Sequence, residues 1–249
     1  MDHSVRVGVL ALQGAFREHI AAFESLGRCI ASEVRTPAQL NDCDALVLPG
    51  GESTAIEKLA RENGLWEALE TWVRDGRPTW GTCAGMILLS NAVASGEATG
   101  GQGRLGGLDI EVARNYFGAQ VRSFERDLEV TELGEQPYTA VFIRAPAVVS
   151  WAPDVKVLAT ISTTRKRKRM DETGARIKCG SGDAAEDLHV TADGSSSGYV
   201  HKPGAVAVAV RHGNLLGTAF HPELTTDNRW HADFLRMARA AAADKTGEA

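Results

Sequence analysis

The chain has 249 residues, 43% of them hydrophobic, which is enough to bury one large α/β core or two small ones. Its net charge of -5 gives no general attraction to nucleic acid or to an anionic membrane, and no apolar run approaches the roughly 18 residues that a membrane helix needs. Four cysteines without a C-x-x-C pair indicate reduced thiols, and with no secretion-signal pattern at the N-terminus we expect a cytoplasmic protein.

The first part of the chain alternates strand and helix patterns. "VRVGVLAL" (5–12) is typical of a strand buried on both faces, and "AFREHIAAFESLG" (15–27) has helical spacing and a terminal glycine. "DALVLPGG" (44–51) and "STAIEKLARENG" (53–64) repeat the unit, with Ser53 or Thr54 as the expected helix cap. A helix at 64–76 and a strand, turn and third core helix over 77–93 follow. This alternation predicts a parallel sheet with right-handed crossovers.

The second part is richer in strands. Strand patterns occur in "LDIEVARNYFG", "TAVFIRAP", "VKVLATIS" and "VAVAVRHGNLLGTAF", the last with a hairpin turn at 212–214. A closing helix, "DNRWHADFLRMARAAAA", carries an apolar face of Trp230, Phe234, Met237 and Ala238. We therefore predict an α/β fold: a three-layer, open, mostly parallel sheet flanked by helices, with a strand-rich mixed or antiparallel edge. We expect a single domain over residues 1–240 and a C-terminal tail over 241–249.

Residues 162–204 interrupt this domain. The segment is polar, rich in glycine and serine, and nearly free of large apolar groups, so we predict a disordered insertion. Its "RKRKR" run (165–169) is either a nuclear-localisation or nucleic-acid patch or a solvated charge run, and we favour the solvated run. Cys179, His189 and His201 lack metal-ligand spacing, so no metal site is expected.

"GTCAG" (81–85) has the layout of a nucleophile elbow. Flanking glycines allow the sharp turn that presents a side chain at the carboxyl edge of the sheet. The N-terminus of a helix favours a thiolate at Cys83, and the amide of Ala84 can donate to an oxyanion. The alternative is a buried structural cysteine, which we expect for Cys29 and Cys43.

A cysteine nucleophile requires a general base and a group that orients the base. His221 follows an apolar strand, and Glu223 lies two residues on, so both side chains face the same side of an extended segment. His19, in the first helix, is the alternative base. The other histidines lie in the N-terminus, the insertion, the hairpin turn or the outer part of the last helix, where we expect them to be solvated; they are His3, His189, His201, His212 and His231.

With these motifs placed, the chain resembles the class I glutamine amidotransferases, and more narrowly the glutaminase subunits of pyridoxal 5'-phosphate synthases. Six blocks carry the resemblance in order: "LALQGAFREH", "LPGGEST", "GTCAGMILL", "RNYFGAQVRSFE", "FIRAP" and "GTAFHPELT". They leave out the insertion, which bacterial members of the family replace with a short turn.

The resemblance implies that Cys83 is the nucleophile, His221 the base and then acid, and Glu223 the orienting carboxylate, with no cofactor. It implies oxyanion donors at Gly51 and Ala84, and a (β/α)8-barrel synthase subunit as the partner that receives the ammonia. Gln13, at the end of the first strand, is our candidate for relaying that contact, and the alternative is that it only caps a helix. The glutamine site that it implies consists of Gly51, Glu52, Ser53, Arg114, Ile143 and Arg144.

Other functions stay open at this point. On the same fold, the chain could be a glutaminase for another synthase or a γ-glutamyl thiol hydrolase. A noncatalytic module that binds nucleic acid through "RKRKR", with a structural Cys83, is a less favoured alternative.

Overall fold

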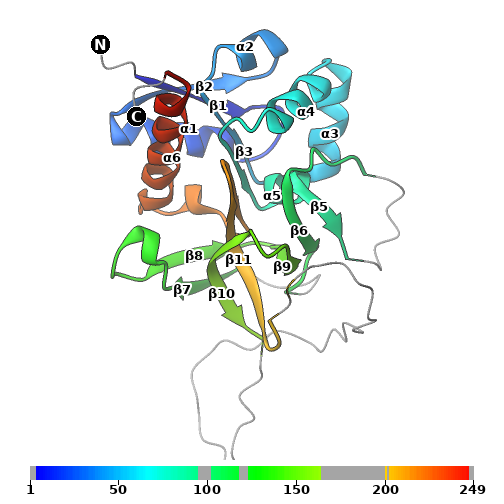
Figure 1. Ribbon diagram of the computed structural model, residues 1–249, viewed down its shortest axis with the longest axis vertical. Helices are drawn as coiled ribbons and strands as arrows, with labels where there is room; N and C mark the ends of the chain where they lie inside the picture. The colour runs from blue at the N-terminus through cyan, green and yellow to red at the C-terminus, as the bar shows by residue number, and fades with distance from the viewer. Residues whose placement is uncertain (1–3, 95–101, 118–122, 164–199, 201, 247–249) are drawn as a thin grey trace, which may run out of the picture.

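Figure 1 shows the computed structural model of the chain, which describes residues 4–94, 102–117, 123–163, 200 and 202–246. The first elements are β1 (Val5–Leu10), α1 (Phe16–Leu26), β2 (Cys29–Val34), α2 (Pro37–Asn41), β3 (Ala45–Leu48), α3 (Ser53–Glu62), α4 (Trp66–Arg74), β4 (Thr79–Thr82) and α5 (Ala84–Leu89). The later elements are β5 (Ser90–Val93), β6 (Leu108–Ala113), β7 (Phe124–Leu128), η1 (Thr131–Leu133), β8 (Tyr138–Phe142), β9 (Ala147–Trp151), β10 (Lys156–Ser162), β11 (Ala205–His212), β12 (Leu215–Thr218), η2 (Pro222–Leu224) and α6 (Arg229–Thr246).

One large sheet organises the molecule. Its strand order is β2-β1-β3-β4-β12-β11-β9-β6-β5, and β10 pairs with β11 off this path. The strands from β2 to β12 pair in parallel, whereas β11 runs antiparallel to β12, β10 and β9. β7 and β8 form a separate antiparallel pair. The predicted mostly parallel sheet with an antiparallel edge is confirmed.

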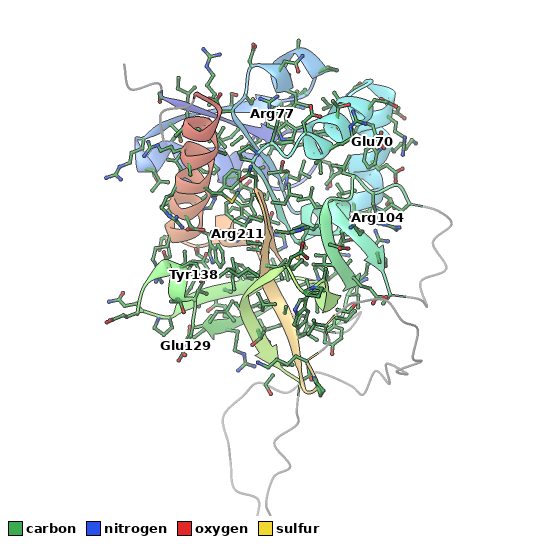
Figure 2. All side chains as sticks on the ribbon, in the orientation of Figure 1. Glu70, Arg77, Arg104, Glu129, Tyr138 and Arg211 are labelled. Atoms are coloured by element: carbon green, nitrogen blue, oxygen red, sulfur yellow. The ribbon has the colours of Figure 1, made fainter. Side chains whose placement is uncertain are left out.

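Helices cover both faces of the parallel half. α1 and α6 contact each other and β1, whereas α5 contacts β3, β4 and β12 and packs against α3 (Figure 1). The predicted apolar face of α6 is buried at Trp230, Phe234, Met237 and Ala238. Arg211 of β11, labelled in Figure 2, forms an ion pair with Asp233 of α6. The three predicted layers are therefore present.

Some boundaries differ from the sequence-based expectations. The cap of α3 is Glu52 and not Ser53 or Thr54, because its carboxylate accepts from two backbone amides of the first turn. The third core helix ends at Leu89, and the apolar pattern continues as strand β5, since a short apolar run does not distinguish helix from strand. α6 continues to Thr246, past the expected boundary at residue 240.

The insertion expected at 162–204 lies largely outside the described residues, so its disorder stays a prediction. Its ends are described. Ser162 closes β10 opposite Ala205 of β11, and Val200 exchanges backbone hydrogen bonds with Trp151. The segment therefore connects two strands, β10 and β11, that pair with each other. The ordered backbone at both of its ends lies inside the expected range of 162–204, so that range is too wide. The RKRKR run, Cys179 and His189 lie outside the described residues, as does His201.

Candidate active site

Cys83 stands at the turn between β4 and α5. Its backbone has φ 47° and ψ -103°, a conformation that side-chain-bearing residues rarely adopt, and the side chain is buried. Both flanking glycines are required by close packing. A Cβ at Gly85 would lie 1.9 Å from the Leu48 carbonyl oxygen, and one at Gly81 would lie 2.5 Å from the backbone of Gly85. The sharp turn that the motif predicts is present.

His221 and Glu223 reach the same edge from the neighbouring strand. β12 pairs in parallel with β4, so the carboxyl ends of both strands meet there, and His221 follows β12 by three residues. His221 Nδ1 lies 2.8 Å from Glu223 Oε1, and its backbone amide donates to the Val141 carbonyl at 2.8 Å. One imidazole nitrogen is thus engaged by a buried carboxylate.

The glycine loop after β3 brings the cysteine and the histidine together. A Cβ at Gly50 would lie 3.4 Å from Cys83 Cβ and 2.4 Å from His221 Cε1, so only glycine fits between them. Burial alone would lower the pKa of His221. Hydrogen bonding to the side chains of Cys83 and Glu223 outweighs burial and raises that pKa to about 10. The two neighbours therefore favour the protonated imidazole, the form that arises when His221 takes a proton.

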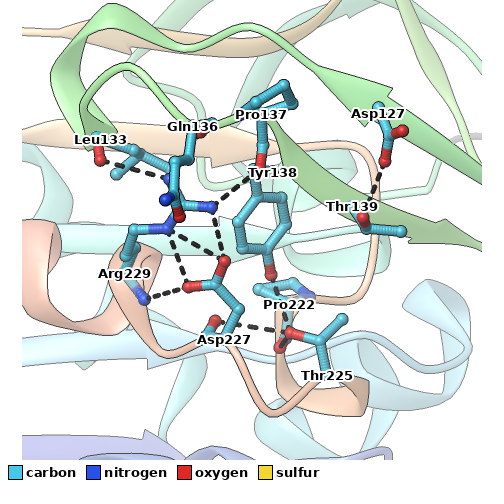
Figure 3. Close-up of polar contacts among 10 residues, drawn as sticks. All are labelled: Asp127, Leu133, Gln136, Pro137, Tyr138, Thr139, Pro222, Thr225, Asp227 and Arg229. Carbon is cyan, nitrogen blue, oxygen red and sulfur yellow. Dashed lines mark hydrogen bonds and ion pairs between the residues drawn. The ribbon is translucent and has the colours of Figure 1, made fainter.

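A polar network supports the turn that carries Glu223, as Figure 3 shows. The Tyr138 hydroxyl and Thr225 Oγ1 lie 3.1 Å apart, and Thr225 donates to the Pro222 carbonyl at 3.1 Å. Burial would raise the pKa of the Asp227 carboxyl, but its pairing with Arg229 outweighs burial and keeps that pKa low. The guanidinium also donates to backbone carbonyls of Leu133, Gln136 and Pro137. These contacts fasten η2 to the segment before β8.

The loop after β1 hydrogen-bonds to the loop that contains Gly50 and Gly51, which we call the glycine loop. Gln13 Oε1 accepts from the Glu52 amide at 2.7 Å, and the Ala15 amide donates to the Gly50 carbonyl at 3.2 Å. The Gly51 amide hydrogen, which is antiparallel to that carbonyl in a trans peptide, therefore points away from Ala15. Ala84 is the first residue of α5 and is buried beside Cys83.

The residues expected to bind substrate are only partly brought together. Arg114 Nη2 donates to Ser53 Oγ and to Gln102 Oε1, which joins two of them and adds a glutamine that the sequence did not indicate. Glu52 uses its carboxylate to cap α3. Ile143 and Arg144 are exposed just after β8, and Arg144 has a φ of 43°.

Two histidines that we expected to be solvated, His231 and His212, contact other groups of the protein instead. His231 is fully buried, not solvated, because it lies three and seven residues before Phe234 and Ala238 on the apolar stripe of α6. That spacing was the signal available in the sequence. His19 is also fully buried, and its Nδ1 lies 3.0 Å from His231 Nε2. His212 is in the hairpin turn as predicted, but it contacts Asp154 and the Gly107 carbonyl.

The described ranges hold neither a cluster of three or more side chains suited to a metal ion nor a helix with the length and apolar character of a membrane span. What the geometry offers is a buried thiol, an imidazole hydrogen-bonded to it, and a carboxylate behind the imidazole. That set is suited to acyl transfer through a thioester.

Comparisons with known proteins point to the same chemistry. The sequence profile of the SNO glutamine amidotransferase family matches residues 9–166. The pyridoxal 5'-phosphate synthase subunit PdxT of Acidothermus cellulolyticus is 45% identical over 95% of this chain and 95% of its own length. A probable pyridoxal 5'-phosphate synthase subunit of Arabidopsis thaliana is 44% identical over 94% of this chain and 86% of its own length.

Solved structures agree on the fold. A crystal structure of a glutamine amidotransferase is 39% identical, has a TM-score of 0.69, and is matched over 94% of this chain and 98% of that one. A putative GMP synthase subunit from Thermoplasma acidophilum is 13% identical with a TM-score of 0.57, covering 98% of both chains, and shows the likeness of the fold alone.

Proposed function

The chain belongs to the SNO glutamine amidotransferase family, and from this premise we propose that Cys83, His221 and Glu223 hydrolyse the side-chain amide of glutamine. As a family member it is a glutaminase subunit of pyridoxal 5'-phosphate synthase. The observation that carries the catalytic assignment is the 2.8 Å contact between His221 Nδ1 and Glu223 Oε1, behind the imidazole that hydrogen-bonds to Cys83.

The reaction proceeds through a glutamyl thioester. The Cys83 thiol gives its proton to His221 as Sγ adds to the amide carbon. The carbon–nitrogen bond then breaks, and His221 gives that proton to the departing nitrogen, which leaves as ammonia. Water then adds to the thioester carbon and gives a proton to His221. The carbon–sulfur bond breaks, His221 returns the proton to Cys83 Sγ, and glutamate leaves. Glu223 holds the imidazole in the required tautomer and stabilises its charged form.

The oxyanion and the substrate head group have separate partners in this proposal. The amides of Ala84 and Gly51 stabilise the negative oxygen of each tetrahedral intermediate. Arg114 with Ser53 binds the charged end of glutamine, and Arg144 supplies a second guanidinium, because two cationic groups suit an anionic amino-acid carboxylate. Ile143 and Glu52 are the remaining residues of the proposed glutamine site.

The partner is a pyridoxal 5'-phosphate synthase subunit, which the names of the relatives imply. We propose that it is a (β/α)8 barrel that takes up the ammonia, and that Gln13 relays its docking to the site. The proposed reaction uses no cofactor and no nucleic-acid partner. The cytoplasmic location expected from the sequence stays a prediction.

Glutamate release by the purified chain, alone and with the synthase subunit, tests the proposal. We expect Cys83→Ala to abolish the activity and His221→Asn to be nearly as severe. Glu223→Gln should be milder but should still lose about a hundredfold in kcat. Cys43→Ala is the matched control, because Cys43 is another buried free cysteine, far from the elbow in the sequence. Equal activity of wild type and Cys83→Ala would exclude the nucleophile.

A further inference from the structure

Two buried histidines lie directly behind the catalytic carboxylate. His19 Nε2, from α1, is 3.4 Å from Glu223 Oε2 and 3.3 Å from Thr82 Oγ1. On its other side, His19 Nδ1 is 3.0 Å from His231 Nε2 of α6. The groups form a file from His221 through Glu223 and His19 to His231, and the thioester mechanism uses only its first two members.

Glu223 Oε2 depends on this file for a donor. Glu223 Oε1 is engaged by His221, whereas Oε2 is buried and, within the described ranges, has no well-formed hydrogen bond. His19 Nε2 faces Glu223 Oε2 at a distance of 3.4 Å. A buried carboxylate oxygen without a donor is costly, so an N–H at this position holds the carboxylate in place.

Only one arrangement of the protons fits all of these contacts. If His19 carries its hydrogen on Nε2, it donates toward Glu223 and Thr82, and its bare Nδ1 accepts from His231 Nε2–H. His231 Nδ1, which is buried and has no partner among the described residues, is then a bare acceptor. The opposite arrangement puts the His19 lone pair against the carboxylate and leaves a buried His231 N–H without an acceptor, so it is disfavoured.

The surroundings keep both imidazoles neutral. The ring of His231 lies 4.9 Å from that of Phe23 and 5.0 Å from that of Trp80, and His19 stands edge-on to Trp80 at 5.5 Å. Burial lowers the pKa of His231 to about 3, and burial with the nearby histidines keeps the pKa of His19 well below its usual value. His19 and His231 are therefore neutral members of the file.

We propose that His19 is a positioning residue that holds Glu223 through its Nε2–H, and that His231 fixes the tautomer of His19. This inference rests on the proposed function, because its consequence is the orientation of the base. His19 does not act as the base itself: Glu223 contacts both imidazoles through different oxygens and lies between them.

Two substitutions of His19 separate its roles. In His19→Gln the side-chain amide nitrogen falls near the former Nε2 and keeps a donor for Glu223, whereas the shorter Asn places its amide near the former Nδ1. For the complex with the synthase subunit, we expect His19→Asn to lower kcat about tenfold with KM within about twofold, and His19→Gln to retain at least about half of kcat. Equal losses in the two variants would overturn the proposal.

A double-mutant cycle asks whether His19 acts through Glu223. In a Glu223→Gln background, adding His19→Asn should cost less than about twofold, because the carboxylate that His19 holds is already gone. A loss of the same size in both backgrounds would mean a general structural role and would contradict the inference. Wild type and Cys83→Ala are assayed in parallel, so a failure of glutamine hydrolysis itself is recognised separately.

A spectroscopic measurement needs no substitution. Nitrogen-15 spectra of the wild-type complex, with labelled histidine, report which ring nitrogen carries the hydrogen. We expect His19 and His231 to be neutral Nε2–H tautomers near pH 7. An Nδ1–H tautomer at His19 would overturn the proposal whatever the variants do, and it would do so even if the chain did not hydrolyse glutamine.

Discussion

The backbone of Cys83 is strained in the turn that presents its side chain to the active site. A residue with a Cβ at φ 47° and ψ -103° costs of order 1–3 kcal/mol, and glycine avoids most of that cost. We therefore predict that Cys83→Gly is more stable than Cys83→Ala by about 1 kcal/mol in urea unfolding, although neither variant hydrolyses glutamine. This order reverses the usual ranking, in which glycine lowers stability relative to alanine.

Cys43 supplies the control for that comparison. It is buried like Cys83, but its φ is not positive. At this position Cys43→Gly should be less stable than Cys43→Ala. If the two positions gave the same order, strain at the elbow would not explain the stability of the Cys83 variants.

Among single residues, the sequence predicted those that local motifs define. The G-x-C-x-G turn and the short spacing of His221 and Glu223 are local, and the structure brings these side chains together. His19 and His231 meet only through the packing of α1 on α6, 212 positions apart in the chain. No local pattern expresses that contact, although the apolar stripe of α6 indicates that His231 is buried.

At the scale of elements, the strands that alternate with helices were predicted because their apolar runs are continuous. β2, β7 and β9 were not predicted as separate strands. β2 is an edge strand with alternating burial, and β7 exposes most of its charged side chains in a two-stranded pair. Pairing partners, and not their own composition, make β2 and β7 strands. β9 reads AVVSW and is largely buried, so its own composition could have predicted it.

The connection between β10 and β11 can be shortened without harm to the sheet. Ser162 stands opposite Ala205, and the Thr163 amide donates to the Gly204 carbonyl at 2.9 Å, so the ends already lie side by side. We predict that replacing residues 164–203 with a short glycine linker leaves a folded chain whose glutaminase activity is within about twofold of wild type.

A second deletion isolates the described end of that segment. Removing only residues 164–199 retains Val200, whose backbone pairs with Trp151, the last residue of β9. Both deletions should melt within a few degrees of wild type. If only the 164–203 deletion melts at a much lower temperature, the pairing of Val200 with Trp151 stabilises the fold. If both deletions do so, the insertion belongs to the folded domain.

For the whole molecule, buried histidines tie stability to pH. The pKa of His231 is lowered to about 3, so between about pH 3 and 6.5 the unfolded chain binds more protons than the folded one, and stability rises with pH. His221 has the opposite sign. Its contribution is complete below about pH 6.5 and is lost as pH rises through about 10. Acid below pH 6.5 and strong alkali should both weaken the fold.

Urea unfolding at pH 7 and pH 5 tests the acid side of this prediction. Each buried neutral histidine should contribute a loss of up to about 2 kcal/mol over that interval. His231→Gln should remove most of its share, because glutamine does not titrate. A loss that is unchanged in His231→Gln would mean that other groups account for the acid sensitivity.

At the scale of the whole molecule, we propose that a partner subunit controls the site through the peptide between Gly50 and Gly51. In this structure the Ala15 amide holds the Gly50 carbonyl through one hydrogen bond of 3.2 Å, which leaves the Gly51 amide as a donor on the other side. Two glycines allow the reverse orientation at low steric cost. In the reverse orientation the site would lose one oxyanion donor, worth roughly 2.7 to 4 kcal/mol.

A synthase subunit that docks on the loop after β1 would stabilise the orientation in which the Gly51 amide is a donor. The reason is that Gln13 and Ala15 of this loop hydrogen-bond to the backbone of Glu52 and Gly50. We predict weak glutaminase activity for the isolated chain and a rise of at least about tenfold when the synthase subunit is added, with Gln13→Ala reducing that rise more than the basal rate. Gln39→Ala is the matched control, since Gln39 also accepts backbone amides but does so at α2. Equal rates with and without the partner would mean that the glycine loop holds its donor unaided, and the control of this site would then have to lie elsewhere.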